Sequence, residues 1–205
     1  MQRRQFITYL GGAVVAGPLA ARAQRDGKTR RIGVLAGLAA DDPLGQVRIE
    51  AFVQELQKLG WTDGANLHID YRWAAGNNSD RVKYATELLS FGPDVLFASG
   101  GSSMPSLLQV SRTVPIVFAN VPDPVGSGFV ESLSQPGGRA TGFMQFEYGL
   151  SGKWVELLKQ IAPTLRRAAV LWDPSLTVAI GQFAVIQAYA PSLGVEVRPV
   201  NVGDI

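Results

Sequence analysis

Residues 31–60, RIGVLAGLAADDPLGQVRIEAFVQELQKLG, join a short apolar run to an amphipathic stretch. The run at 31–36 is too short for a helix and stops at Gly37, which favours a strand. Beyond it, apolar residues recur at spacings of three and four and so share one helical face: Ile49, Phe52, Val53, Leu56 and Leu59. The pair Asp42-Pro43 is typical of a helix N-cap and first turn, and Gly60 of a helix end. The stretch therefore predicts a strand, a loop and a helix.

The same alternation continues along the chain. Further strands are expected at 67–73, 95–99, 114–119, 140–144, 168–172 and 195–202. Further helices are expected at 80–91, 105–111, 129–134, 152–161 and 176–189. Regular alternation of strand and helix predicts an α/β fold with a parallel sheet flanked by helices on both faces.

A boundary is expected near residues 142–151, after a stretch rich in glycine and proline. Only two strands follow it, and two strands do not make a stable sheet covered on both faces. Either these strands extend the first sheet, or they begin a second domain that is incomplete. The domains expected are an export signal at 1–23, a first α/β lobe at 24–146 and the start of a second lobe at 147–205.

The basic charge of the chain belongs to its first 23 residues. The whole sequence has 19 Lys+Arg and 17 Asp+Glu, a net charge of +2. Arg3, Arg4 and Arg22 lie in this leader, which contains no acid, and without them 16 basic groups face 17 acidic ones. The remaining chain is close to neutral, so its charge does not favour nucleic acid as a partner.

The leader has the three parts of a secretory signal. Two arginines precede an apolar stretch, and the small residues at 21 and 23 form a cleavage site before Gln24. The apolar stretch is shorter than the roughly 20 residues that span a bilayer as a helix. The pair Arg3-Arg4 also resembles the twin-arginine export motif. We expect export to the periplasm, with the general and the twin-arginine routes both open.

Composition excludes several kinds of site. The chain has no cysteine and one histidine, which rules out disulfides, a lipid-modified cysteine and metal sites built from several histidines. His68 alternates with apolar neighbours and is expected on the solvent face of a strand. The sequence predicts no metal, no cofactor and no catalytic residue.

Ligands of open parallel sheets bind beyond the carboxyl ends of the strands. The segment Ser99-Gly100-Gly101-Ser102-Ser103 follows one strand, and its glycines allow a close backbone approach while its hydroxyls and free N–H groups favour a ligand carboxylate. Asp123, between two prolines, is suited to a ligand ammonium group. The candidate ligand-binding residues are Ser99, Ser102, Ser103 and Asp123, with Trp172 and Asp173 from the second lobe.

Enzyme signatures are weak. The chain has no GxSxG nucleophile elbow and no phosphate-binding GxxxxGK[ST] loop. An exported α/β enzyme, either a hydrolase or a nucleotide-dependent one, remains an alternative, as does a truncated product without function.

Several segments together resemble one known family. These are the leader through Gln24, residues 59–62 (LGWT), 70–76 (DYRWAAG), 114–119 (VPIVFA), 123–138, 141–143, 151–154 (SGKW), 157–158 and 161–163. They are similar to ABC-transporter substrate-binding proteins related to tryptophan/tyrosine-binding periplasmic proteins. The resemblance covers essentially the whole chain.

The resemblance implies a type I periplasmic-binding fold, in which two α/β lobes close on a small, amino-acid-like ligand and deliver it to an inner-membrane ABC permease. It also implies a monomer, and a family longer than this chain, so that most of the second lobe is missing. Arg139 and the segment 101–104 depart from the family pattern, which leaves the identity of the ligand open.

Overall fold

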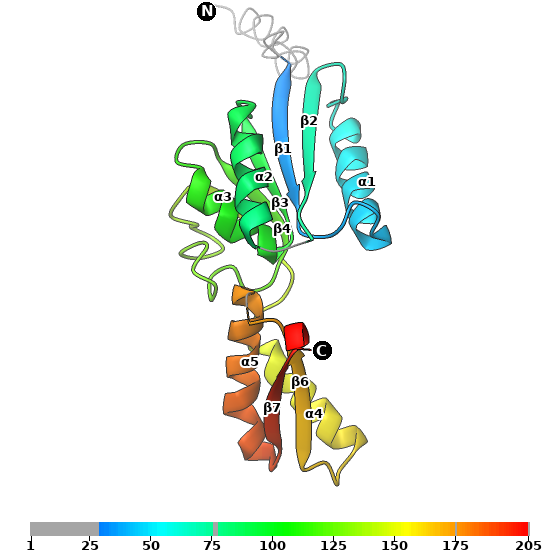
Figure 1. Cartoon of the computed structure of the whole chain (residues 1–205), viewed down its shortest axis with the longest axis vertical. Coiled ribbons are helices and arrows are strands. Elements are labelled where there is room, and N and C mark those ends of the chain that lie inside the picture. The colour runs from blue at the N-terminus through cyan, green and yellow to red at the C-terminus, as the bar shows by residue number, and fades with distance from the viewer. Residues whose placement is uncertain (1–28, 76–77, 175, 205) are drawn as a thin grey trace, which may run out of the picture.

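The computed structural model describes residues 29–75, 78–174 and 176–204, and they form two separate parallel sheets (Figure 1). The predicted leader at 1–23 and the start at Gln24 lie outside these residues. The strands are β1 (Arg30–Ala36), β2 (Leu67–Trp73), β3 (Val95–Ser99), β4 (Ile116–Val121), β5 (Ala140–Met144), β6 (Arg167–Trp172) and β7 (Glu196–Asn201). The helices are α1 (Pro43–Lys58), α2 (Asn78–Ser90), α3 (Met104–Val110), α4 (Leu150–Ile161) and α5 (Thr177–Tyr189). Short 3-10 turns are η2 (Gly101–Ser103), η3 (Ala190–Leu193) and η4 (Val202–Asp204).

The first sheet has the strand order β2-β1-β3-β4-β5, and every pair in it is parallel. Helix α1 covers one face, over a core that includes Val34, Ile69 and the stacked rings of Phe52 and Phe97. Helices α2 and α3 cover the other face, over a core that includes Leu35 and Phe118. The predicted α/β fold with helices on both faces is confirmed. We call this sheet with α1, α2 and α3 the first lobe.

Strands β6 and β7 pair in parallel with each other and do not join the first sheet. With α4 and α5 they form what we call the second lobe, whose core includes Val155, Ile186 and Val195. The alternative in which these strands extend the first sheet is therefore wrong. Each strand of this second sheet has a single neighbour among the described residues, whereas β1 in the first sheet lies between β2 and β3. The boundary between residues 146 and 147 stays a prediction.

Local signals in the sequence explain how the first helix begins. The Asp42 carboxylate accepts hydrogen bonds from the N–H groups of Leu44 and Gly45 at 2.8 and 3.1 Å. These groups have no acceptor within the helix, so the cap satisfies them. Gly60, just beyond the helix, has a φ of 83°, which glycine adopts at little cost. The predicted cap and end of α1 are confirmed.

One predicted helix is absent. Residues 129–134 form bends and irregular chain, not a helix. The N–H of Phe129 donates to the carbonyl of Pro124, and the N–H of Glu131 donates to that of Pro136. The Ser132 hydroxyl both donates to the carbonyl of Gln135 and accepts from its N–H. These bonds give the backbone an alternative to a helical ladder, as serine side chains in loops often do.

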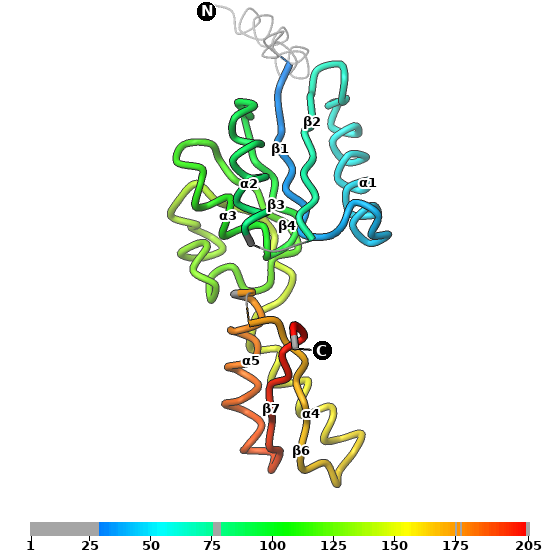
Figure 2. The backbone as a smooth tube through the Cα atoms, in the orientation of Figure 1, coloured from blue at the N-terminus to red at the C-terminus, as the bar shows by residue number. Residues whose placement is uncertain are grey.

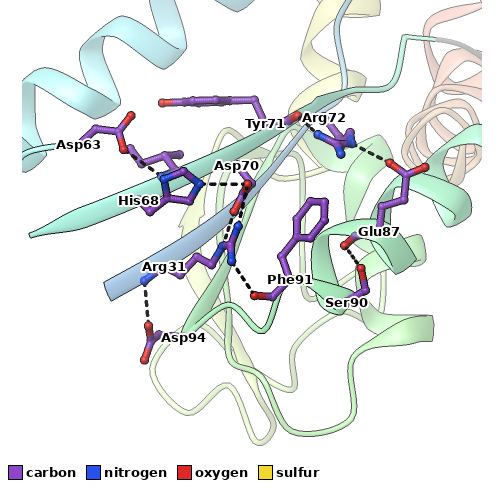
Figure 3. Close-up of polar contacts among 11 residues, drawn as sticks. Arg31, Asp63, His68, Asp70, Tyr71, Arg72, Glu87, Ser90, Phe91 and Asp94 are labelled. Atoms are coloured by element: carbon purple, nitrogen blue, oxygen red, sulfur yellow. Dashed lines mark hydrogen bonds and ion pairs between the residues drawn. The ribbon is translucent and has the colours of Figure 1, made fainter. Parts of the chain in front are cut away.

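A charged network joins β1 and β2 to the end of α2 (Figure 3). The Arg31 guanidinium binds both carboxylate oxygens of Asp70, at 2.6 and 3.3 Å, and donates to the carbonyl of Phe91. The guanidinium of Arg72 binds Glu87 at 2.8 Å, and both guanidiniums lie over the Phe91 ring. His68, a largely exposed strand residue as predicted, lies 3.3 Å from Asp70. The network fixes β2 and α2 at the edge of the sheet.

Asp70 gives the fold a defined acid sensitivity. The hydrogen bond from Arg31 is the main cause that lowers the pKa of the Asp70 carboxyl. A lowered folded-state pKa contributes stability that is complete above the unfolded pKa, near 4, and is lost as the pH falls through the folded value.

We predict that Asp70→Asn lowers the free energy of unfolding by about 1 kcal/mol at pH 7, since a partly exposed charged hydrogen bond is lost. The difference from the parent chain should shrink below about pH 4, where the parent's carboxyl also becomes protonated. Urea unfolding at a series of pH values measures both effects. Glu55→Gln, which breaks the exposed pair with Lys58, is the control and should change little. A deficit in Asp70→Asn that persists unchanged at low pH would contradict the assignment.

Candidate functional site

Three serines lie where β1 and β3 end. Ser99 is the last residue of β3, and its carbonyl accepts from the N–H of Gly37, which follows β1, at 3.0 Å. Turn η2 then places Ser102 and Ser103 against the same glycine. A Cβ built on Gly37 would overlap the Ser102 Oγ and would lie 3.6 Å from the Ser103 Oγ. Gly37 therefore makes room for the two hydroxyls. We call Ser99, Ser102 and Ser103 the serine cluster.

Ser103 is buried without a partner for its hydroxyl. Its exposed fraction is 0%, and its Oγ has no hydrogen-bond partner in the described part of the chain. A buried hydroxyl left unsatisfied costs about 1–3 kcal/mol, so such groups in folded proteins call for an explanation. Helix α3, which follows the cluster, has only seven residues. A helix this short has a weak positive end, which adds little to the attraction of an anion.

The segment after β4 has an unusual backbone. Asn120 and Asp123 have φ values of 58° and 36°, a region that residues other than glycine adopt at a cost. The carbonyl of Ala119, beside Asn120, accepts from the N–H of Gly100, which ties this segment to the serine cluster. The carboxyl ends of β1, β3 and β4 therefore meet at one edge of the sheet, as predicted for parallel strands.

Asp123 joins this edge to the segment that leads into the second lobe. Its N–H donates to the carbonyl of Phe146 at 2.7 Å. Its carboxylate accepts from the N–H of Tyr148 at 3.0 Å through Oδ2, and from that of Gly126 at 2.7 Å through Oδ1. Residues 145–149, which we call the crossing segment, are thus held to the end of β4. Each carboxylate oxygen has a second lone pair and can accept a further bond.

Tyr148 contacts both lobes. Its hydroxyl lies 2.5 Å from the Ser127 Oγ in the first lobe, and its ring lies where a side chain at Gly181 of α5 would be. Only 7% of the residue is exposed. Burial is the main cause that raises the pKa of its phenol, so Tyr148 stays neutral near pH 7 and keeps its hydrogen bond. No motif in the sequence marks this residue, although a glycine within the α5 pattern indicates a close approach to that helix.

Trp172 and Asp173 lie at the carboxyl end of β6, in the second lobe. Both line a pocket of about 310 Å³ along β6 and α5, and Trp154 of α4 is part of the same wall. The Trp172 ring packs at 5.0 Å from that of Phe183. The structure thus brings together Ser99, Ser102 and Ser103, places Asp123 after β4 at the same edge of the sheet, and locates Trp172 and Asp173 in a separate wall. Whether these residues bind a ligand stays a prediction.

Among residues 29–75, 78–174 and 176–204, no group of three or more His, Asp or Glu side chains could hold a metal ion. No helix of the described residues is long and apolar enough to cross a membrane.

Comparison with known proteins gives a consistent result. The family described as ABC transporter substrate binding protein matches residues 32–205. A tyrosine-binding protein of Clostridioides difficile (strain R20291) is 28% identical over 148 residues, which are 72% of this chain and 42% of that protein. A conserved domain protein of Vibrio cholerae has a similar structure, with a TM-score of 0.77 at 28% identity over 85% of this chain and 58% of its own.

A Streptococcus pneumoniae ABC domain solved in complex with L-Trp has a TM-score of 0.75 at 24% identity, over 85% of this chain and 58% of its own. The chain thus spans about half the length of the relatives it matches. These likenesses confirm the predicted type I periplasmic-binding fold.

Asp123→Ala tests whether this carboxylate holds the crossing segment. The change removes two charge-assisted hydrogen bonds and places alanine at a φ of 36°, so we expect the free energy of unfolding to fall by about 2 kcal/mol. Chemical denaturation followed by circular dichroism measures the change. Asp41→Ala, at an exposed position before α1, is the control. An Asp123→Ala chain as stable as this control would contradict the structural role.

Proposed function

We propose, from the premise that this chain belongs to the ABC transporter substrate-binding protein family, that it binds a small amino-acid-like ligand between its lobes and delivers it to a permease of the inner membrane. The protein then acts by binding and not by catalysis. The two lobes give such a ligand two walls, and differential contacts with an open and a closed arrangement would drive closure.

The unpartnered Ser103 hydroxyl is the observation that carries this proposal. It lies in the serine cluster, at the edge of the sheet where ligands of parallel α/β folds bind. A polar ligand group beside Gly37 would give Ser102 and Ser103 hydrogen-bond partners. Ser99 would line the binding site at the end of β3. The remaining lone pairs of Asp123 suit an ammonium group, and Trp172 with Asp173 would form the opposite wall. A group with both charges, such as an amino acid, matches these partners.

The tyrosine-binding relative supports an amino acid as the ligand class. Export completes the proposal: residues 1–23 direct the chain to the periplasm by the general or the twin-arginine route, and cleavage before Gln24 releases it as a monomer. An importer of this kind needs the binding protein on the outer side of its permease.

Thermal unfolding with added L-tyrosine tests the proposal. A ligand that binds only the folded chain stabilises it by an amount that grows with concentration, about 2.7 kcal/mol at 100 times the Kd. We expect a rising Tm with L-tyrosine or with another amino acid of a panel that includes L-tryptophan and L-leucine. No shift with any amino acid at millimolar concentration would overturn the proposed ligand class.

Ser103→Ala separates binding from folding. Removing a hydroxyl that has no partner should leave the stability of the ligand-free chain unchanged or slightly higher, because the buried polar group is gone. The affinity for the amino acid should fall about 5- to 10-fold, the value of one hydrogen bond. Calorimetric titration measures the affinity, and Ser90→Ala at the distant end of α2 is the control. Equal affinities in the two variants would remove Ser103 from the site.

A further inference from the structure

Helix α5 lies so close to the first lobe at Gly101 that a side chain there would have to displace Val178. A Cβ built on Gly101, the first residue of η2, would lie 2.9 Å from Val178 Cγ2 and 3.4 Å from Pro122 Cδ. Carbon atoms in good contact are about 3.5–4.0 Å apart. The backbone of Gly101 lies outside the left-handed region, so its conformation does not demand glycine. The space between the lobes does.

A second close approach lies on the same face of α5. Gly181 is three residues beyond Val178, and residues at this spacing are neighbours on a helix surface. The ring of Tyr148 occupies the place of a Gly181 side chain, while the Tyr148 hydroxyl reaches Ser127 in the first lobe. The N–H of Tyr148 is held by Asp123. One face of α5 therefore meets the first lobe at Gly101 and the crossing segment at Tyr148.

Figure 2 shows the path of the chain between the lobes: the backbone passes beside the first turns of α5, and these turns lie next to the first lobe. Tyr148 ties the crossing segment to both lobes, whereas Val178 and Gly101 are joined only by contact. The Tyr148 contact is thus suited to act as a pivot, and the Gly101 contact as the point that stops further approach.

We infer that Gly101 is a positioning residue that sets how closely the second lobe can approach the first. The inference rests on the proposed function, since it concerns the arrangement that would hold a ligand. A ligand shifts an equilibrium only by its different affinity for the two arrangements. A side chain at 101 that disfavours the close arrangement therefore weakens binding even where the ligand does not touch it.

The absence of cysteine allows a direct measurement of the distance between the lobes. Spin labels attached at Glu50→Cys in α1 and Gln160→Cys in α4, both exposed positions, report the distance between the lobes by pulsed electron paramagnetic resonance. In the full chain we expect Gly101→Ala to lengthen or broaden the distance distribution by about 2 Å or more, because a methyl group needs about 1 Å more room at the contact and α4 amplifies the movement. Adding Val178→Ala should restore the parent distribution.

Gly149→Ala is the matched control. It lies at the end of the crossing segment in right-handed helical backbone, and a Cβ there meets no atom within 4 Å. It should leave the distances unchanged. Cooperative unfolding of each variant verifies that the lobes are folded. Unchanged distances in Gly101→Ala, or a change that Val178→Ala does not reverse, would overturn the inference.

Calorimetric titration with L-tyrosine adds the binding result. Gly101→Ala should weaken the affinity about 5- to 10-fold, and the double variant should recover it. If the distances respond as expected but the parent chain binds neither L-tyrosine nor any other amino acid, the proposed function fails while the role of Gly101 in lobe spacing stands. If the parent binds and Gly101→Ala binds equally well, the link from lobe spacing to affinity is wrong.

Discussion

Parallel pairing of β1 with β2 and β3 is the constraint on which the rest of the first lobe depends. Parallel neighbours cannot be joined by a tight turn, so β1, β2, β3 and β4 are connected in succession through α1, α2 and α3, and every strand of this sheet ends at the same edge. The loops after β1, β3 and β4 are therefore brought together whatever their own sequences. At that edge, Gly37 leaves room for the hydroxyls of Ser102 and Ser103, which make this end of the sheet polar.

The second constraint is the way in which Asp123 holds the crossing segment. Its N–H and both carboxylate oxygens bind backbone groups, two of them in residues that lead into the second lobe. The chain accepts an unfavourable φ at this residue to make these bonds. Tyr148, fixed in this way, packs on Gly181 and relates the orientation of α5 to the end of β4. The end of β4 and the segment leading into the second lobe are thereby linked through one carboxylate.

Much of this could be predicted from the sequence, because strand and helix periods, the Asp42 cap and glycine stops are local signals. The predicted bounds of the seven described strands agree with the observed bounds to within about two residues. The helix expected at 129–134 does not form, because Ser132 and Pro136 give the backbone other hydrogen-bond partners. The serine cluster followed from a glycine pair after a strand. The bond of Asp123 to Tyr148 and the contact of Gly101 with Val178 could not be predicted, because they depend on distances between segments far apart in the chain.

The central claim is that a ligand meets this chain at the carboxyl ends of the first-lobe strands. Nitrogen-15 NMR spectra of the chain titrated with L-tyrosine test it residue by residue. We predict shifts that saturate at Gly37, Gly100–Ser103 and Asp123, and none at the network around Arg31 in β1 and Asp70 in β2. Saturable shifts confined to the pocket along β6, or no shift at the serine cluster in a chain that binds, would contradict it.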